Sequence, residues 1–304
     1  MNRLINLLSA ENIPFAEHCP ISKYSTFRVG GTARLAVFPQ RREQMEKLLF
    51  VLAETEQPYA VVGKGSNLLF PDGEFDGVML FTTQMSDIRC VGRELQVMAG
   101  ASLGAVAIRA ASMSLGGAEF AAGIPGTVGG GVLMNAGAYG GCMEQIVTYV
   151  DCWNRKTGVV ERFGEGEHGF SYRASHYANA NDLVILEVGL RLFERDRGAV
   201  EGLMADYRRR RLASQPLEYP NGGSVFKNPE GYAAGKLIED CGLKGEHVGG
   251  AWVSEKHANF IVNKGGATAE DVRTLIRLIR QRVLEQTGIT LICELRDLNG
   301  LLLF

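Results

Sequence analysis

Apolar and polar positions follow one another along the chain in a pattern typical of small helices alternating with short strands. Apolar residues three or four positions apart predict a short amphipathic helix within residues 1–15, ended by Glu11, Asn12 and Pro14, and another over 41–56. Short runs rich in β-branched and aromatic residues predict strands at 59–62, 77–82, 88–91, 95–99, 146–153 and 183–193. Ser102 is expected to cap a helix that continues to Ala111, and another helix is expected over 200–212.

The pattern changes at residues 214–223, where the sequence SQPLEYPNGG is expected to form neither helix nor strand. We place a domain boundary there. Beyond it, the pattern predicts strands at 224–226, 251–253 and 260–262, and helices at 233–241 and 269–286. Because long all-apolar parallel strands are absent, the sequence favours two or three α+β units over a doubly wound sheet.

Composition narrows the class of protein. The chain has 304 residues, 46% apolar and 22% charged, which is typical of globular domains, and its net charge of −2 gives no pull toward nucleic acid. The six cysteines lack C-x-x-C spacing and no histidines stand at metal-ligand spacing, so we expect reduced thiols, no disulfide and no metal. No apolar run reaches the ~18 residues that span a bilayer. We therefore expect a soluble, cytoplasmic protein without membrane insertion.

Glycine is the outlier, at 38 residues, and two glycine-rich loops are candidates for anion binding. One follows the strand at 59–62 and reads GKGSNLL over 63–69; the other reads AGIPGTVGGG over 122–131. Backbone amides can converge on an anion in such loops, so the pair suggests a pyrophosphate seated between them. Neither loop is a Walker A motif, and Leu68 stands where a dinucleotide fingerprint needs its third glycine. Each loop alone could equally be an ordinary tight turn.

Seven motifs point further. They are STFRVGG (25–31), GSNLL (65–69), AGIPGTVGG (122–130), MNAGAYG (134–140), SYR (171–173), GSVFKNP (223–229) and HANFI (257–261). In this order, from about 24 to 300, the chain closely resembles the UDP-N-acetylenolpyruvoylglucosamine reductase family.

The resemblance implies an α+β fold of the vanillyl-alcohol-oxidase type, with two FAD-binding subdomains over 1–83 and 84–213 and a substrate-binding domain over 214–304. The last residues either stay with that domain or return to the FAD-binding part. The implied reaction reduces the enolpyruvyl ether of UDP-N-acetylglucosamine enolpyruvate to UDP-N-acetylmuramate for peptidoglycan synthesis, and so for cell wall, shape and division. NADPH is the co-substrate, non-covalent FAD passes hydride from N5 to the vinyl carbon, and no obligate protein partner is implied.

The family motifs assign a cofactor role to residues of both loops and of the segment that follows. These residues are Gly63, Lys64, Gly65, Ser66, Asn67, Leu68, Gly123, Pro125, Gly126, Thr127, Gly129, Gly130, Asn135 and Gly137. Lys64 departs from the glycine usual at this position, and it either contacts a phosphate or points to solvent.

Three residues fall on catalytic positions of the family. Ser224 falls on the proton donor, Arg173 on the arginine that binds the enolpyruvyl carboxylate, and Glu294 on the catalytic glutamate. A forked guanidinium suits a carboxylate, and a carboxylate among apolar neighbours is costly unless it is used. Without the resemblance, Ser224 would be an ordinary turn serine and Arg173 a surface arginine. Most relatives carry a first acid where this chain has Ile292, which leaves Glu294 as the local candidate.

Tyr172, Lys227, Asn228 and Asn259 are expected to bind the substrate, since they lie in matching motifs. The run 208–211 of four arginines either attracts a diphosphate or NADPH or forms a solvated helix face. About fifty residues separate Arg173 from Ser224, which is typical of the shorter family form without a substrate-clamping tyrosine loop.

Two other functions remain open at this point. A flavin oxidase of the same fold would turn over with oxygen and show no preference for UDP-sugars. A non-catalytic nucleotide-binding module would keep the loops and lose activity. The motif pair GSVFKNP and the Glu294 region argues against the oxidase, and retention of Arg173, Ser224 and Glu294 argues against the module.

Overall fold

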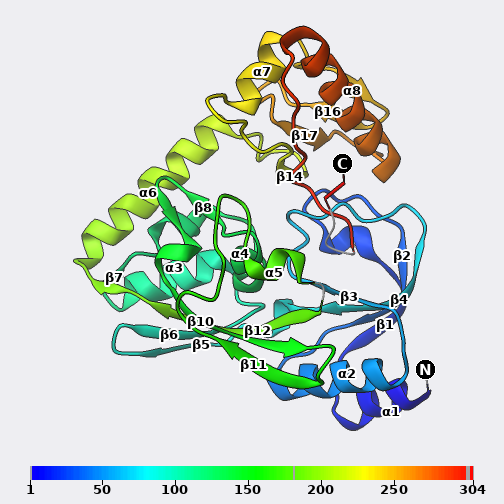
Figure 1. Ribbon diagram of the computed structural model, residues 1–304, viewed down its shortest axis with the longest axis vertical. Helices are drawn as coiled ribbons and strands as arrows, with labels where there is room; N and C mark the ends of the chain where they lie inside the picture. Colours follow the sequence, from blue (N-terminus) through cyan, green and yellow to red (C-terminus); the bar gives the residue numbers. More distant parts are fainter. Residues whose placement is uncertain (1, 181, 299–301, 304) are drawn as a thin grey trace. The chain divides into compact units, whose positions relative to one another are not determined.

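A computed structural model describes residues 2–180, 182–298 and 302–303 (Figure 1). The chain divides into two compact units. Unit 1 comprises residues 1–17, 35–64 and 76–210, and unit 2 comprises residues 18–34, 65–75 and 211–304. The division into 1–83, 84–213 and 214–304 remains a prediction, and its last residues at 299–301 and 304 lie outside the described part of the chain.

A four-stranded sheet in the order β1-β2-β4-β3 carries the first helices of unit 1. Its strands are β1 (Phe15–Pro20), β2 (Thr32–Val37), β3 (Tyr59–Val62) and β4 (Glu74–Phe81). The helices α1 (Asn2–Ala10) and α2 (Arg42–Glu54) lie beside each other (Figure 1). Leu4, Leu8, Met45 and Leu48 from these helices form one buried core with strand residues such as Val78, because each helix has a single apolar face.

A five-stranded antiparallel sheet is the second large sheet of unit 1, in the order β11-β10-β12-β6-β5. Its strands are β5 (Ile88–Val91), β6 (Glu94–Met98), β10 (Val147–Asn154), β11 (Val159–Phe163) and β12 (Leu183–Arg191). Alternate residues face two cores: Val150 and Cys152 join the core that includes helix α3 (Leu103–Ser112), while Trp153 joins the core around α1 and α2. This two-sided burial follows from the period of two in a strand.

Shorter elements complete unit 1. They are β7 (Leu115–Gly116), α4 (Val128–Leu133), β8 (Gly137–Ala138), β9 (Gly141–Cys142), α5 (His176–Asn179), β13 (Phe193–Glu194) and the exposed helix α6 (Arg197–Ser214), whose last four residues belong to unit 2.

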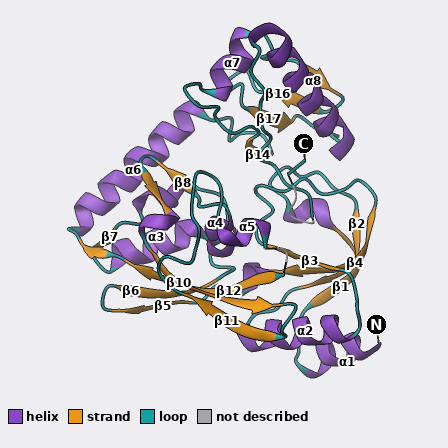
Figure 2. Cartoon of the chain, in the orientation of Figure 1, coloured by secondary structure: helices purple, strands orange, loops and turns teal. Residues whose placement is uncertain are grey.

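Unit 2 is built on the sheet β14-β17-β16-β15, which helices α7 and α8 accompany (Figure 2). The bounds are β14 (Asn221–Ser224), α7 (Ala234–Asp240), β15 (His247–Val248), β16 (Ala251–Val253), β17 (Phe260–Asn263) and α8 (Ala269–Thr287). Val272, Leu275 and Ile279 on one face of α8 are fully buried in this unit's apolar core. The Asp72 carboxylate accepts hydrogen bonds from the first amides of α8, at Ala269 and Glu270, and so caps the helix.

Most predicted elements are confirmed, and β3 and β5 have the predicted bounds. The Ser102 cap is confirmed too, since its hydroxyl accepts from the Ala105 amide. One prediction was wrong, and one helix begins where the sequence pattern makes no prediction. Residues 221–223 belong to strand β14, where Gly222 packs so closely on the Phe27 ring that a Cβ would overlap it. Helix α4 begins at Val128, inside the glycine run, because the preceding threonine caps it.

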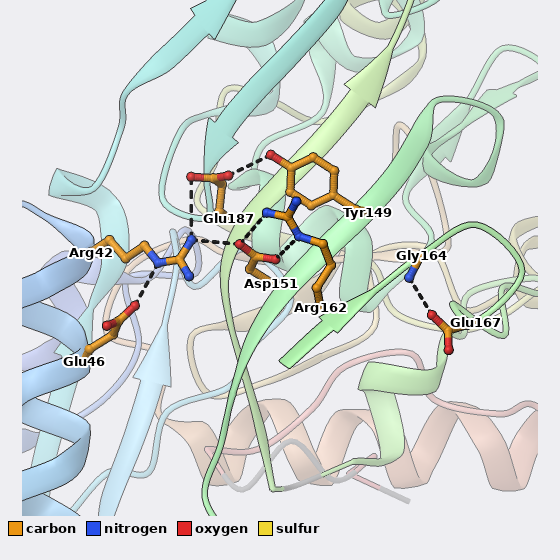
Figure 3. Close-up of polar contacts among 8 residues, drawn as sticks. All are labelled: Arg42, Glu46, Tyr149, Asp151, Arg162, Gly164, Glu167 and Glu187. Atoms are coloured by element: carbon orange, nitrogen blue, oxygen red, sulfur yellow. Dashed lines mark hydrogen bonds and ion pairs between the residues drawn. The ribbon is translucent and has the colours of Figure 1, made fainter. Parts of the chain in front are cut away.

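A charged network ties α2 to the five-stranded sheet (Figure 3). The buried Asp151 carboxylate on β10 accepts from Arg162 on β11 at 2.7 and 2.9 Å and from Arg42 on α2 at 2.8 Å. Arg42 also pairs with Glu46, and Glu187 on β12 accepts a 2.7 Å hydrogen bond from the Tyr149 hydroxyl. Hydrogen bonds from both arginines hold the pKa of Asp151 below its usual range, against the effect of burial.

Among the described helices, none is long and apolar enough to cross a bilayer.

Candidate active site

The two glycine loops meet within unit 1, at the end of β3 and the start of α4. Gly63 lies so close to Thr127 that a Cβ on the glycine would overlap the threonine hydroxyl. That hydroxyl already accepts a 3.3 Å hydrogen bond from the Gly130 amide as the cap of α4. The close approach explains why glycine stands at position 63, and it brings the two loops into contact.

Some amides of the second loop are already used by the protein. Val128 donates to the Ala101 carbonyl at 2.8 Å and Gly129 donates to the Ala99 carbonyl at 2.9 Å. The buried amides of Gly126 and Thr127 donate to no acceptor among the described residues. An unpaired buried amide costs free energy, so these two amides fit an anionic group bound at this loop.

The first loop continues into unit 2, where Gly65 has a φ of 60° and packs against the Tyr24 carbonyl. The amides of Lys64, Gly65 and Ser66 also donate to no acceptor among the described residues. The Asn67 side-chain amide donates to the Glu294 carbonyl at 3.1 Å. The loop that the sequence assigns to the cofactor is therefore joined, inside unit 2, to the segment that carries the predicted catalytic glutamate.

Three extended segments of unit 2 lie side by side and carry most of the predicted reactive groups. Leu69 donates to the Arg296 carbonyl at 2.9 Å, which pairs the end of the first loop with residues 294–296. On the other side, Glu294 donates to the Val225 carbonyl at 2.7 Å and Lys227 donates to the Ile292 carbonyl at 2.9 Å. We name residues 67–69, 292–296 and 224–227 the three-strand ledge. It places Ser224 and Glu294 on neighbouring backbones, as the predicted catalytic pair requires.

Ser224 stands at the end of β14, partly exposed, and its hydroxyl has no hydrogen-bond partner among the described residues. The segment that follows is fixed by Asn259, which is 4% exposed: its Oδ1 accepts from the Phe226 amide at 2.9 Å and its Nδ2 donates to the Phe226 carbonyl at 2.8 Å. Both polar atoms of Asn259 thus hold the ledge itself. A fixed backbone beside an unengaged hydroxyl suits a proton donor.

The other two predicted substrate residues of unit 2 follow on the same segment. The Lys227 side chain is partly exposed and pairs with no described carboxylate. The Asn228 Oδ1 accepts from the Ala234 amide at 3.0 Å, at the start of α7. Lys227 therefore offers a cation, whereas Asn228 offers its amide group and orders the next helix.

Charged and titratable groups near the ledge are buried to different degrees. Arg296, 7% exposed, interacts electrostatically with Glu294 and Asp297, while burial lowers its pKa. Burial also lowers the pKa of His257, whose Nδ1 accepts a 3.3 Å hydrogen bond from the Asn259 amide. A neutral His257 keeps that hydrogen bond, and with it the residue that fixes the segment after Ser224.

Arg173 belongs to unit 1 and stands in a turn of left-handed backbone, with a φ of 55°. Ser171 and Ala174 exchange two backbone hydrogen bonds of 3.1 Å, which leaves Tyr172 and Arg173 at the tip. The Arg173 Nη2 donates to the Gly137 carbonyl at 3.3 Å, and its guanidinium lies 5.2 Å from the centre of the Tyr172 ring. Tyr172 is 56% exposed, as expected for a ring that meets a ligand.

A buried histidine supports the segment that carries this turn. His168 Nδ1 and the Tyr177 hydroxyl are 2.8 Å apart, and the His168 carbonyl accepts from the His176 amide at 2.7 Å. Burial lowers the pKa of His168 and raises that of Tyr177. Both groups are therefore neutral near pH 7.

Two arginines of the run 208–211 pair with a carboxylate of their own helix, α6. Arg209 and Arg210 both pair with Asp206, one turn earlier, and Arg208 to Arg210 are exposed. This favours the solvated helix face over a diphosphate site.

Sequence reasoning missed two tyrosines beside the predicted cofactor segment. The rings of Tyr139 and Tyr207 stack at 4.4 Å, and the Tyr139 hydroxyl donates to the Tyr207 carbonyl at 3.0 Å. Tyr139 lies in the motif MNAGAYG, but a partner sixty-eight positions away leaves no local signal in the sequence.

Comparison with known proteins decides the family. A profile described as "FAD binding domain" matches residues 33–164, and one described as "UDP-N-acetylenolpyruvoylglucosamine reductase, C-terminal domain" matches residues 215–298. The UDP-N-acetylenolpyruvoylglucosamine reductase of Pediococcus pentosaceus is 43% identical over 280 residues, which cover 92% of this chain and 93% of the relative. That of Clostridium botulinum (strain Okra / Type B1) is 42% identical over 282 residues, which cover 91% and 90%.

The chain belongs to the UDP-N-acetylenolpyruvoylglucosamine reductase family.

A solved structure supports the same assignment. The UDP-N-acetylenolpyruvylglucosamine reductase of Thermus caldophilus superposes with a TM-score of 0.78 at 35% identity, covering 94% of this chain and 98% of that one. Together with the FAD-binding profile, this confirms the predicted α+β, vanillyl-alcohol-oxidase-like fold and the resemblance stated from the motifs. FAD is the cofactor of this family member. Of the two glycine loops, all residues except 65–69 belong to unit 1. The roles of individual residues stay predictions.

Proposed function

We propose that this chain uses NADPH to reduce the enolpyruvyl ether of UDP-N-acetylglucosamine enolpyruvate to the lactyl ether of UDP-N-acetylmuramate, in the cytoplasm. The observation that carries the proposal is the three-strand ledge, where Ser224 and Glu294 stand on hydrogen-bonded neighbouring segments. Family membership supplies the class of reaction, and the ledge supplies two groups able to manage charge and protons.

FAD fits the loops, because Gly63 allows the close approach to Thr127 and the amides of Gly126, Thr127 and residues 64–66 are open to an anion. When bound, FAD carries hydride from NADPH to the vinyl carbon of the substrate. Every other task falls to the side chains of the protein.

Adding hydride to the vinyl carbon leaves negative charge on the neighbouring carbon and on the substrate carboxylate. We assign Arg173 to that carboxylate, because a guanidinium can bind it through two parallel hydrogen bonds. Ser224 donates the proton to the carbanion. A serine is a weak acid, and it is credible here because the carbanion is a strong base and the Ser224 hydroxyl is not engaged by the described residues.

Glu294 is assigned to the same step as Ser224. Its backbone is fixed on both sides, by the amide it donates to Val225 and by the carbonyl that Asn67 holds. A carboxylate carried on a backbone fixed this way can orient the serine hydroxyl and balance charge as the proton leaves. Lys227 is a cation for the UDP diphosphate, and Tyr172 is a hydrogen-bonding ring for the sugar.

The test is an assay of NADPH oxidation by the purified protein, with and without UDP-N-acetylglucosamine enolpyruvate, under air and under nitrogen. We expect consumption that depends on this substrate, continues without oxygen and yields UDP-N-acetylmuramate by mass spectrometry. Equal NADPH consumption with oxygen alone, and no lactyl product, would support the oxidase and defeat the proposal. Purified protein without flavin absorbance would contradict every FAD-based function.

A further inference from the structure

Asn135 is a buried residue in the segment after α4, and its side chain forms hydrogen bonds with two other parts of unit 1, at Glu144 and Ser171. It is 5% exposed, with a φ of 42° in the left-handed region. Its Nδ2 donates to the Ser171 carbonyl at 3.1 Å and to the Glu144 Oε2 at 3.3 Å, while its Oδ1 accepts from the Glu144 amide at 3.0 Å. Both the NH₂ group and the oxygen of the Asn135 side chain therefore form hydrogen bonds within the protein.

One of these partners is the first residue of the turn that presents Arg173. Two more contacts join the same pair of segments: the Ser175 hydroxyl donates to the Leu133 carbonyl at 2.8 Å, and Arg173 donates to the Gly137 carbonyl. Residues 133–137 therefore hold residues 171–175 at the backbone before the tip, at the guanidinium and after the tip. Asn135 supplies the bond before the tip.

An arginine with left-handed backbone needs such support. The left-handed conformation costs roughly 1–2 kcal/mol for a residue with a Cβ, and it persists only where its surroundings fix it. A guanidinium that must meet a carboxylate through two parallel bonds also needs a fixed direction. Loss of the bond to Ser171 would free the backbone on which that direction depends.

We propose that Asn135 is a positioning residue for Arg173: it orders the 171–174 turn so that the guanidinium faces the substrate carboxylate, and its side chain touches neither substrate nor FAD. This rests on the proposed function, and it replaces the cofactor contact that the sequence predicts for the Asn135 side chain. Glycine tolerates the same φ, so Asn135→Gly removes the three hydrogen bonds without straining the backbone.

A matched control lies elsewhere in unit 1, at Asn154. The Asn154 side chain donates to Glu161 at 2.8 Å and accepts from the Lys156 amide at 2.9 Å, in the β10–β11 hairpin. Asn154→Ala therefore removes a comparable set of hydrogen bonds but leaves the Arg173 turn alone.

The experiment measures binding of UDP-N-acetylglucosamine enolpyruvate to the FAD-loaded protein by calorimetry without NADPH, together with the FAD content of each variant. We expect Asn135→Gly to weaken substrate binding about tenfold and to keep its FAD, whereas Asn154→Ala binds as the parent does. In an Arg173→Ala background, Asn135→Gly should change binding less than about twofold, because the side chain through which it acts is gone.

Equal losses from Asn135→Gly in both backgrounds would overturn the proposal, and so would lost FAD with unchanged substrate binding. Amide hydrogen exchange in residues 171–174 gives a reading that needs no substrate. Exchange should be faster in Asn135→Gly than in Asn154→Ala, and equal exchange would contradict the ordering role. If the parent protein failed to bind the enolpyruvyl substrate, the proposed function would fall, and this exchange measurement would still decide the role of Asn135.

Discussion

In unit 1, Arg173 has a left-handed backbone and stands on a tight turn held by side-chain hydrogen bonds from Asn135 and Ser175. In unit 2, Ser224 and Glu294 stand on extended segments held by backbone hydrogen bonds and an apolar core. The arrangement in unit 1 sets the direction of the Arg173 side chain. The arrangement in unit 2 sets the spacing between the backbones of Ser224 and Glu294. The group proposed to bind a carboxylate and the pair proposed to move a proton thus have different kinds of support.

The largest effect that sharpens this contrast is expected from Arg173→Lys. Lysine keeps the charge but loses the planar fork, so substrate binding should weaken roughly 10²-fold. Reduction of the bound flavin by NADPH in the absence of substrate should stay within about twofold of the parent rate. Calorimetry and anaerobic absorbance measure the two quantities separately. A large loss of flavin reduction with normal substrate binding would mean that Arg173 serves NADPH instead.

A second variant acts on the support of unit 1 alone. Asp151→Asn removes the negative charge that pairs with both Arg42 and Arg162 (Figure 3). We expect a loss of about 2 kcal/mol in the free energy of unfolding, less than for a fully buried pair because both arginines are partly exposed. Hydrogen exchange should rise in β10 to β12 and stay unchanged in α8. A uniform rise across both units would show that they do not differ in this way.

Gly130→Ala is expected to change the stability of the FAD-free protein and its affinity for FAD in opposite directions. A Cβ at Gly130 would make only ordinary contact, 3.5 Å from the Thr127 hydroxyl, and Gly130 lies in the first turn of α4. Alanine raises helix propensity by about 1 kcal/mol, so the FAD-free protein should become slightly more stable. FAD binding should nevertheless weaken about tenfold (about 1.4 kcal/mol), because the added Cβ would lie in the loop proposed to hold the pyrophosphate. Undiminished FAD retention would make Gly130 an ordinary helix residue.

In each unit, some features could be predicted from the sequence and others could not. Motif order identified the family, and local patterns gave most helices and strands, because both depend on residues close together in the chain. The left-handed turn at Arg173 and the Asn67–Glu294 contact across 227 positions left no local signal. The start of α4 within a glycine run was missed because propensity argues against it, while the Thr127 cap and packing decide. Side-chain roles within motifs, as at Asn135 and Asn259, depend on partners that only the fold supplies.

The smallest expected effect concerns pH. Burial lowers the pKa of His168, so the folded chain binds fewer protons there than the unfolded chain. Its stability contribution is complete above pH ~6.5, the unfolded value, and is lost as the pH falls through the folded pKa. We expect a loss below about 1 kcal/mol, with faster exchange in residues 168–177. His168→Gln should remove this part of the pH dependence and leave the part due to His257; an unchanged profile would refute the assignment.

Ser224 and Glu294 are proposed to act together on the substrate carbanion, and anaerobic rapid mixing of Ser224→Ala can separate that step from flavin reduction. NADPH should still bleach the flavin of this variant at the parent rate, because no carbanion forms in that step. The return of flavin absorbance on adding UDP-N-acetylglucosamine enolpyruvate should slow about 10²–10⁴-fold, and Glu294→Gln should show the same division. If Ser224→Ala instead slowed the bleaching and left the return unchanged, Ser224 would not be the acid and the account would be wrong.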